Sequence, residues 1–228
     1  MLLGGDLFHE NKPSRKIICQ AIYLIRKYCF GKKTQKFQVL NLPDFNESDK
    51  TLPKFNIKDP NLNISIPLFS IHGNHDDPIG MEGLCSLDIF SNAGLVNYFG
   101  KIQSSEKISI KPVMFRKGDS NLSIYGLGSL KDSRLQKMFK ANLVQAEPPP
   151  ISNTESFNIF VLHQNRYKHN EESYIPEDIL FEFLDLVFWG HEHECLIDPI
   201  QVKNKGYFLT QPGSSVITSL SKGESVTK

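Results

Sequence analysis

The stretch Leu186-Val-Phe-Trp-Gly-His-Glu-His193 joins a short apolar run to a polar block that starts with glycine. Three similar blocks each follow an apolar run: Gly4-Gly-Asp-Leu-Phe-His9 after residues 2–3, Gly73-Asn-His-Asp76 after residues 66–71, and His163-Gln-Asn165 after residues 158–162. The runs are short and rich in β-branched or aromatic residues, which is typical of buried strands. Because ligands in open α/β sheets gather where strands end, we expect the four blocks to meet at one sheet edge.

The four blocks offer carboxylate, amide oxygen and imidazole groups, a mixture that suits divalent manganese, iron or zinc. Asp6 follows two glycines, and each of its two oxygens could bind one metal ion while glycine lets the backbone approach closely. Asn74 supplies a neutral amide oxygen, and the adjacent His75 is available as a general acid. Each block alone is also compatible with an ordinary turn, cap or core histidine. The four together predict a metal site.

Two details of these blocks remain open at the level of sequence. Asp76 or Asp77 could fix the tautomer of His75, although each is equally well explained as a helix or turn cap. His191 and His193 stand two positions apart just past a strand, so both could reach a metal only if the backbone turns there.

Composition limits the classes of protein that this chain can be. With 228 residues and 39% hydrophobic content, one domain is expected. A net charge of +1 neither supports nor excludes a nucleic-acid partner. The four cysteines form no C-x-x-C pair and no signal peptide is expected, which favours a reducing intracellular compartment. The longest apolar stretches are too short to span a bilayer, so no membrane partner is expected.

Periodicity along the chain predicts alternating helices and strands, and hence a layered α/β core. Helices are expected over residues 14–29, over residues 81–91 and from Pro176 onward, and further strands over residues 112–115 and 122–127. Residues 31–63 are polar and contain three prolines, which indicates an insert of the kind that is functional or disordered.

The order Gly-Asp, Gly-Asn-His-Asp, His and Gly-His-x-His resembles the calcineurin-like metallophosphoesterase superfamily. Longer stretches are similar to the eukaryotic double-strand-break repair nuclease of the meiotic recombination eleven family; they cover residues 4–14, 70–78, 163–166, 189–195 and 211–215. The resemblance implies an α/β fold, a layered metallophosphoesterase sandwich of mixed sheets flanked by helices. The nuclease core would span residues 1–228.

The resemblance also implies a role for each site residue. Asp6 would bridge two Mn²⁺ ions, with Asn74, His163 and His191 on one metal and His193 on the other. His75, together with Asp76, would serve catalysis by protonating the leaving oxygen or organising the phosphate. His9 would contact the phosphate.

By resemblance, the protein is a manganese-dependent 3′–5′ exonuclease and endonuclease that hydrolyses phosphodiesters at DNA ends. It would act in double-strand-break repair and meiotic recombination in the nucleus, with a Rad-fifty-type ATPase as partner. A nibrin-type partner would dock on residues 31–63, and a homodimer would form through the helices at 14–29 and 81–91.

One feature of the family is missing from these 228 residues: its opening Asp-x-His block. We therefore expect a fold that lacks its first strand, with an incomplete second metal site. The capping domain is also expected to be absent, since the family has it beyond the residue that matches Lys228. A different class of function is thus an alternative, a metal-deficient fragment that acts only as a dimerisation and partner-docking scaffold. A third hypothesis is hydrolysis of small phosphate esters.

Overall fold

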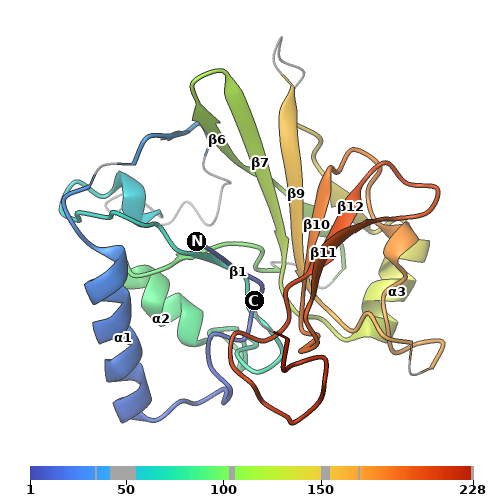
Figure 1. The fold of residues 1–228 in the computed structure, drawn as a ribbon, viewed down its shortest axis with the longest axis horizontal. Helices are drawn as coiled ribbons and strands as arrows, with labels where there is room; N and C mark the ends of the chain where they lie inside the picture. Colours follow the sequence, from blue (N-terminus) through green and yellow to red (C-terminus); the bar gives the residue numbers. More distant parts are fainter. Residues whose placement is uncertain (34, 42–54, 103–105, 150–154, 169, 227–228) are drawn as a thin grey trace.

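The computed structural model describes residues 1–33, 35–41, 55–102, 106–149, 155–168 and 170–226. The elements stack in layers, with two helices outside a small sheet, a large sheet beside it, and a third helix beyond (Figure 1). The outer helices are α1 (Arg15–Cys29) and α2 (Ser86–Asn92), and the third is α3 (Asp132–Lys140). The predicted layered α/β fold is confirmed.

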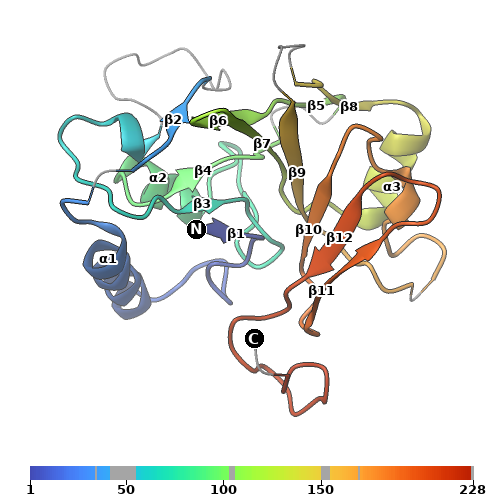
Figure 2. The ribbon, with the colours of Figure 1, turned by 45° about the horizontal axis from the view of Figure 1, so that its top comes forward.

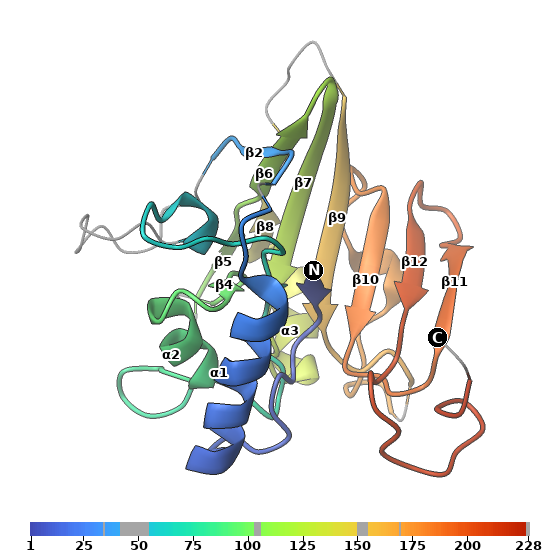
Figure 3. The ribbon, with the colours of Figure 1, turned by 60° about the vertical axis from the view of Figure 1, so that its left-hand side comes forward.

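The two main sheets differ in their strand directions. The small sheet is parallel, in the order β1 (Leu2–Leu3), β3 (Phe69–Ser70), β4 (Asn97–Tyr98). The large sheet is mixed, and Figure 3 shows most of its strands side by side; its order is β11 (Leu196–Gln201), β12 (Phe208–Gln211), β10 (Leu186–Gly190), β9 (Ser156–His163), β7 (Ser120–Leu127), β6 (Val113–Lys117), β2 (Gln38–Val39). A short parallel pair, β5 (Ile108–Ile110) and β8 (Val144–Ala146), lies near α3 in Figure 2.

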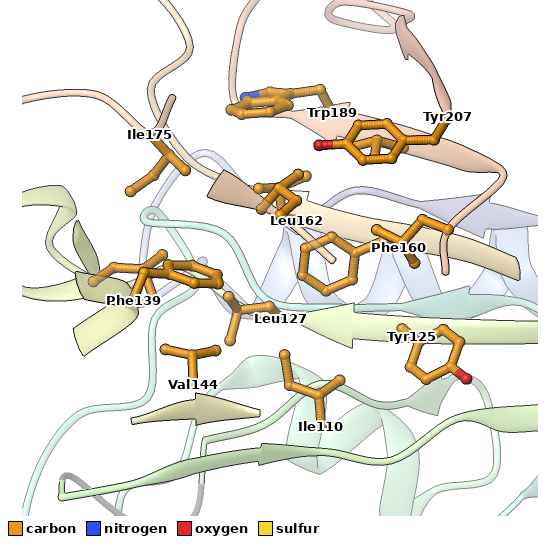
Figure 4. Close-up of a cluster of buried hydrophobic side chains, with 14 of the residues drawn as sticks. Ile110, Tyr125, Leu127, Phe139, Val144, Phe160, Leu162, Ile175, Trp189 and Tyr207 are labelled. Carbon is orange, nitrogen blue, oxygen red and sulfur yellow. The ribbon is translucent and has the colours of Figure 1, made fainter. Parts of the chain in front are cut away.

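Both faces of the large sheet are buried. Successive side chains of a strand point to opposite faces, and along β9 Phe160 and Leu162 join the cluster that packs against α3. Figure 4 shows that cluster, with Phe139 of α3 close to the strand residues. Val161 points the other way, into a second cluster that includes Phe69 of the small sheet. Burial on both faces explains why β9 is an almost continuous apolar run.

Helix α1 forms where the spacing of apolar residues predicts it. The Ser14 side chain accepts a hydrogen bond from the Ile17 N–H at 3.4 Å, and Arg26 and Lys27 lie in the last turn, where positive charge is favourable. Ile25 is buried against the small sheet's cluster. The opposite side of the helix is exposed.

The prediction of a helix that begins at Pro176 and leads into the strand at residue 186 is wrong. Only a 3₁₀ turn forms, over Glu177–Ile179, and the chain then runs irregularly to β10. Leu180 and Leu184 are buried and the phenylalanines between them pack on the same cluster, so this segment covers the sheet without a helical face. The side chain of Asn158 donates to the Phe183 carbonyl at 3.0 Å, which gives that backbone group a partner outside any helix.

Helix α2 is shorter than the predicted 81–91, and α3 was not predicted. Residues 79–84 turn back on themselves instead, with Gly80 at φ 78° and Gly83 at φ 56°. The helix begins after Cys85, whose N–H donates to the Asp88 carboxylate at 2.8 Å.

The polar insert is built into the fold at both of its described ends. Val39 of β2 pairs with Phe115 of β6, which adds an edge strand to the large sheet. Phe55 is fully buried, and the Asn56 N–H donates to the Asn97 side chain at 2.9 Å. Residues 34 and 42–54, the middle of the predicted insert, lie outside the described residues. Within the described part of the chain, no helix is long and apolar enough to cross a membrane.

Candidate metal centre

The four polar blocks meet where strands of the two sheets end. Asp6 follows β1 and Asn74 follows β3, which pair in parallel in the small sheet. His163 ends β9, and it is opposite Gly190 in the parallel pair of β9 and β10, so that His191 lies next to it. One ligand atom each from Asp6, His163 and His191 lie within 4.8 Å of one another.

The loops that carry these residues approach each other closely. A Cβ on Gly73 would lie 2.6 Å from the backbone nitrogen of Asp6, and one on Gly190 would collide with the Gly4 carbonyl oxygen. Asp6 and His191 themselves adopt positive φ angles of 53° and 80°, a region that side chains other than glycine rarely occupy. Such backbone strain is concentrated at functional sites because the surrounding structure must hold it in place.

The tautomer of His163 follows from its contacts. Its Nδ1 lies 2.5 Å from the Gly4 carbonyl oxygen, and since a carbonyl can only accept, Nδ1 carries the proton. In a neutral imidazole with its proton on Nδ1, the Nε2 atom has a lone pair. That lone pair faces the Asp6 carboxylate at 3.3 Å and the Asn74 amide oxygen at 3.0 Å.

His191 has the opposite tautomer. Its Nε2 lies 2.9 Å from the Asn165 side-chain oxygen and donates to it, which leaves the lone pair on Nδ1. That atom is 2.9 Å from the Asn74 oxygen and 3.3 Å from His163 Nε2.

Four lone pairs therefore converge with no proton between them, from Asp6, Asn74, His163 and His191. Such groups repel one another unless a cation lies among them. The donor set, one carboxylate, one amide oxygen and two imidazoles, fits a divalent transition metal. In each histidine the second ring nitrogen is fixed by an oxygen acceptor, as is common for metal-binding imidazoles.

The electrostatics keep these groups in the forms that bind metals. Burial alone would raise the pKa of Asp6, but the neighbouring His163 ring and the N–H of His75, which lies 2.9 Å from Oδ1, outweigh it and lower the pKa. Burial, and then the neighbouring His163 ring, lower the pKa of His191. At neutral pH the carboxylate is thus charged and the His191 ring neutral.

The predicted catalytic residues lie at the edge of this cluster. The rings of His75 and His9 stack with their centroids 4.8 Å apart. Asp76 is fully buried, and its carboxylate accepts the backbone N–H groups of Leu7 at 2.8 Å and Gly73 at 2.5 Å. Asp76 therefore ties the loop after β1 to the loop after β3. Burial raises its pKa, although these hydrogen bonds oppose the shift.

His193 lies apart from the other predicted ligands. Its Nδ1 contacts the Thr218 hydroxyl at 2.6 Å, and the Glu224 carboxylate is 3.9 Å away. Two supporting residues were missed by the sequence analysis. Asn165 was quoted within its block but given no role, and Asp132 at the start of α3 was not considered.

The geometry agrees with comparisons to known proteins. The family model described as "Calcineurin-like phosphoesterase" matches residues 1–195. The chain belongs to the calcineurin-like phosphoesterase family. It is 52% identical over 228 residues to the proteins called "Double-strand break repair protein MRE11" of Mus musculus and Homo sapiens. It is 48% identical over 229 residues to "Double-strand break repair protein mus-23" of Neurospora crassa.

These alignments cover 100% of this chain, and 32%, 32% and 31% of the three relatives. The predicted resemblance to the double-strand-break repair family is confirmed. This calcineurin-like phosphoesterase chain spans about a third of the length of the curated relatives it matches.

Proposed function

We propose that this chain is a metal-dependent phosphodiester hydrolase, the nuclease core of a double-strand-break repair protein that acts on DNA ends. The observation that carries the proposal is the convergence of four lone pairs, from Asp6, Asn74, His163 and His191, where four strands end. The names of relatives 52% identical to the chain supply the substrate class.

A bound divalent metal would neutralise charge on the phosphoryl oxygens and lower the pKa of water, and we propose manganese. Asp6, Asn74, His163 and His191 would hold the first ion. Asp6 would also reach a second ion, together with His193, the two ligands that the described chain offers there.

His75 is the residue that we propose for proton transfer. Its backbone N–H is fixed on the Asp6 carboxylate, which keeps the ring at the rim of the metal cluster, where it could give a proton to the leaving oxygen. His9 stacks on this ring and is the proposed phosphate contact. Asp76 supports both histidines by joining their loops.

The exposed face of α1 is the proposed homodimer surface. Tyr23, Leu24 and Tyr28 have 61%, 49% and 63% of their surface exposed, and Ile89 of α2 has 60%. Large apolar side chains gathered on helices suit an isologous contact with a second copy. A Rad-fifty-type ATPase, a nibrin-type partner on residues 31–63 and a nuclear, meiotic role complete the proposal.

The deciding experiment compares Asp6→Asn with Asp119→Asn, an exposed aspartate in the turn between β6 and β7. Manganese binding is followed by electron paramagnetic resonance, and cleavage by release of labelled nucleotides from double-stranded DNA ends. We expect Asp6→Asn to lose both signals and Asp119→Asn to keep both.

Two results would favour the other hypotheses. Hydrolysis of an aryl phosphate without DNA cleavage in the unmodified chain would indicate a small-ester phosphatase. Dimerisation by analytical ultracentrifugation with no bound manganese would indicate a scaffold.

A further inference from the structure

Behind His191 lies a chain of polar side chains that begins at Asp132, the first residue of α3. One carboxylate oxygen of Asp132 is 2.7 Å from the Gln164 side-chain nitrogen, and the other is 2.6 Å from the Asn165 side-chain nitrogen. Because an ionised carboxylate can only accept hydrogen bonds, both amides must turn their NH₂ groups toward Asp132. Asn165 then presents its oxygen to His191.

The two amides differ in how firmly they are fixed. Gln164 is 3% exposed; its oxygen accepts the Leu130 N–H at 2.9 Å and its nitrogen donates to the Leu130 carbonyl at 2.6 Å. Gln164 cannot turn over without losing both bonds. The side-chain amide of Asn165 bonds to Asp132 at one end and to His191 at the other. Its orientation is therefore set by Asp132.

We propose that Asp132 is a positioning residue that fixes the tautomer of His191 through Asn165. With the Asn165 oxygen facing it, His191 must carry its proton on Nε2 and direct the Nδ1 lone pair into the metal cluster. The proposal rests on the proposed function for its purpose, a preformed metal site, but the tautomer itself can be measured without metal or DNA.

The substitution Asp132→Asn makes a specific prediction. Since Gln164 is fixed and still donates, the new amide must turn its oxygen to Gln164 and its NH₂ to Asn165. Asn165 must then turn over and donate to His191 Nε2. The proton of His191 moves to Nδ1, where it can donate to the Asn74 oxygen at 2.9 Å, and the lone pair for the metal is lost.

The double variant Asp132→Asn with Asn165→Asp is the matched rescue. A carboxylate at position 165 can accept from both the new amide and His191 Nε2–H, so the original tautomer returns. The net charge equals that of the unmodified chain. If Asp132 had only a structural role, moving the negative charge from position 132 to position 165 would not restore the tautomer of His191.

The experiment is ¹⁵N NMR of the histidine rings in the metal-free chain at about pH 8, where the lowered pKa of His191 keeps its ring neutral. We expect the His191 proton on Nε2 in the unmodified chain, on Nδ1 in Asp132→Asn, and on Nε2 again in the double variant. Manganese affinity should fall roughly 10- to 100-fold in Asp132→Asn and recover in the double variant. Asp119→Asn should match the unmodified chain in both measurements.

A proton on Nδ1 of His191 in the unmodified chain would overturn the proposal, and this measurement needs no variant to fold. An unchanged tautomer in folded Asp132→Asn would overturn it as well, as would a double variant that does not recover. If the tautomers shift as expected but no form binds manganese or cleaves DNA, the positioning role stands and the proposed function fails.

Discussion

His191 and His193 stand two residues apart, yet they lie in different surroundings. His191 is partly buried at the end of β10, with Nε2 donating to Asn165 and Nδ1 facing the metal cluster. The side chain of His193 is 45% exposed and contacts the segment at 214–226. The Thr218 hydroxyl donates to Glu224 at 2.8 Å, so it must accept from His193, whose proton is on Nδ1.

The two histidines thus offer opposite ring nitrogens, Nδ1 in His191 and Nε2 in His193. The difference arises from the partner of the protonated ring nitrogen, the one that points away from the metal: Asn165 for His191 and Thr218 for His193. For His191 that partner is fixed by α3 and the loop after β9, whereas for His193 it belongs to a loop that returns to the chain through the Cys195 N–H, 2.9 Å from the Gly223 carbonyl. The motif supplies the two histidines, and the hydrogen bond of each protonated ring nitrogen decides which nitrogen is left to bind a metal.

The largest expected effect separates these two residues directly. His191→Ala removes one of four converging ligands and should weaken manganese binding more than 100-fold, because changes to groups that only hold a metal ligand in place already cost 10- to 100-fold. His193→Ala should leave the first ion's affinity within about threefold, since His193 lies outside that cluster. Isothermal titration calorimetry with manganese measures both.

Equal losses in the two variants would contradict the comparison. They would mean that both rings bind the same ion and that the contact between His193 and Thr218 is broken when metal enters.

A second prediction tests the close approach of the loops. Gly73→Ala places a Cβ against Asp6 and should destabilise the fold by about 1–3 kcal/mol while displacing the Asp6 carboxylate. Gly206→Ala, where a Cβ meets nothing within 4 Å, is the control and should leave stability and manganese binding nearly unchanged. Urea unfolding of the metal-free chain gives the first quantity, and calorimetry gives the second. Unimpaired metal binding in Gly73→Ala would show that Asp6 can move and still bind.

His72 extends the comparison to a histidine whose two ring nitrogens are both used in hydrogen bonds inside the protein, so that neither is left for a metal. Its Nε2 lies 3.3 Å from the Ser129 carbonyl and its Nδ1 is 2.8 Å from the Tyr98 hydroxyl. Burial lowers the pKa of His72 to about 4. The folded state disfavours protonation of His72, so the neutral ring contributes to the free energy of unfolding. This contribution is complete above the unfolded pKa of about 6.5 and is lost as the pH falls toward 4.

Between pH 7 and pH 5 we expect His72 alone to reduce the free energy of unfolding by roughly 2 kcal/mol. The measurement is urea unfolding at both pH values in the presence of a chelator, for the unmodified chain and for His72→Gln. The variant should be less stable at pH 7 but less sensitive to pH. The same pH dependence in both chains would show that His72 does not become protonated in this range.

The sequence predicted the strands that deliver the site because β9 and β10 are short apolar runs buried on both faces, a local signal. It also predicted α1, whose apolar spacing and Ser14 cap are local too. The prediction of a helix from Pro176 was wrong because the apolar side chains of this segment pack against the core without a helical backbone, and tertiary packing overrides such a pattern. Helix α3 has a signal that was overlooked, with Leu135, Met138 and Phe139 at helical spacing and all buried.

The site divides in the same way. Asp6 and Asn74 could be predicted as candidates from the blocks, because their side-chain type alone makes them possible metal ligands. The role of Asp132 could not, because it depends on contacts with residues more than 30 positions away, and an aspartate at a helix start is ordinary. The contact of His193 with Thr218 could not be predicted either, since Thr218 lies 25 positions further along the chain.

The smallest expected effect concerns the His193 side of the comparison. Thr218→Val removes the hydroxyl that links His193 to Glu224 and should cost at most about 1 kcal/mol of stability, because Glu224 keeps its hydrogen bonds from the Thr218 N–H and the Ser219 hydroxyl. Manganese affinity at the first site should stay within about twofold, since none of its ligands is touched. The informative measurement is ¹⁵N NMR of His193, which should change from a single tautomer with the proton on Nδ1 to a mixture, while His191 keeps its proton on Nε2. A change at His191 instead would show that the two rings are coupled, and that the partner of the protonated ring nitrogen does not by itself set each tautomer.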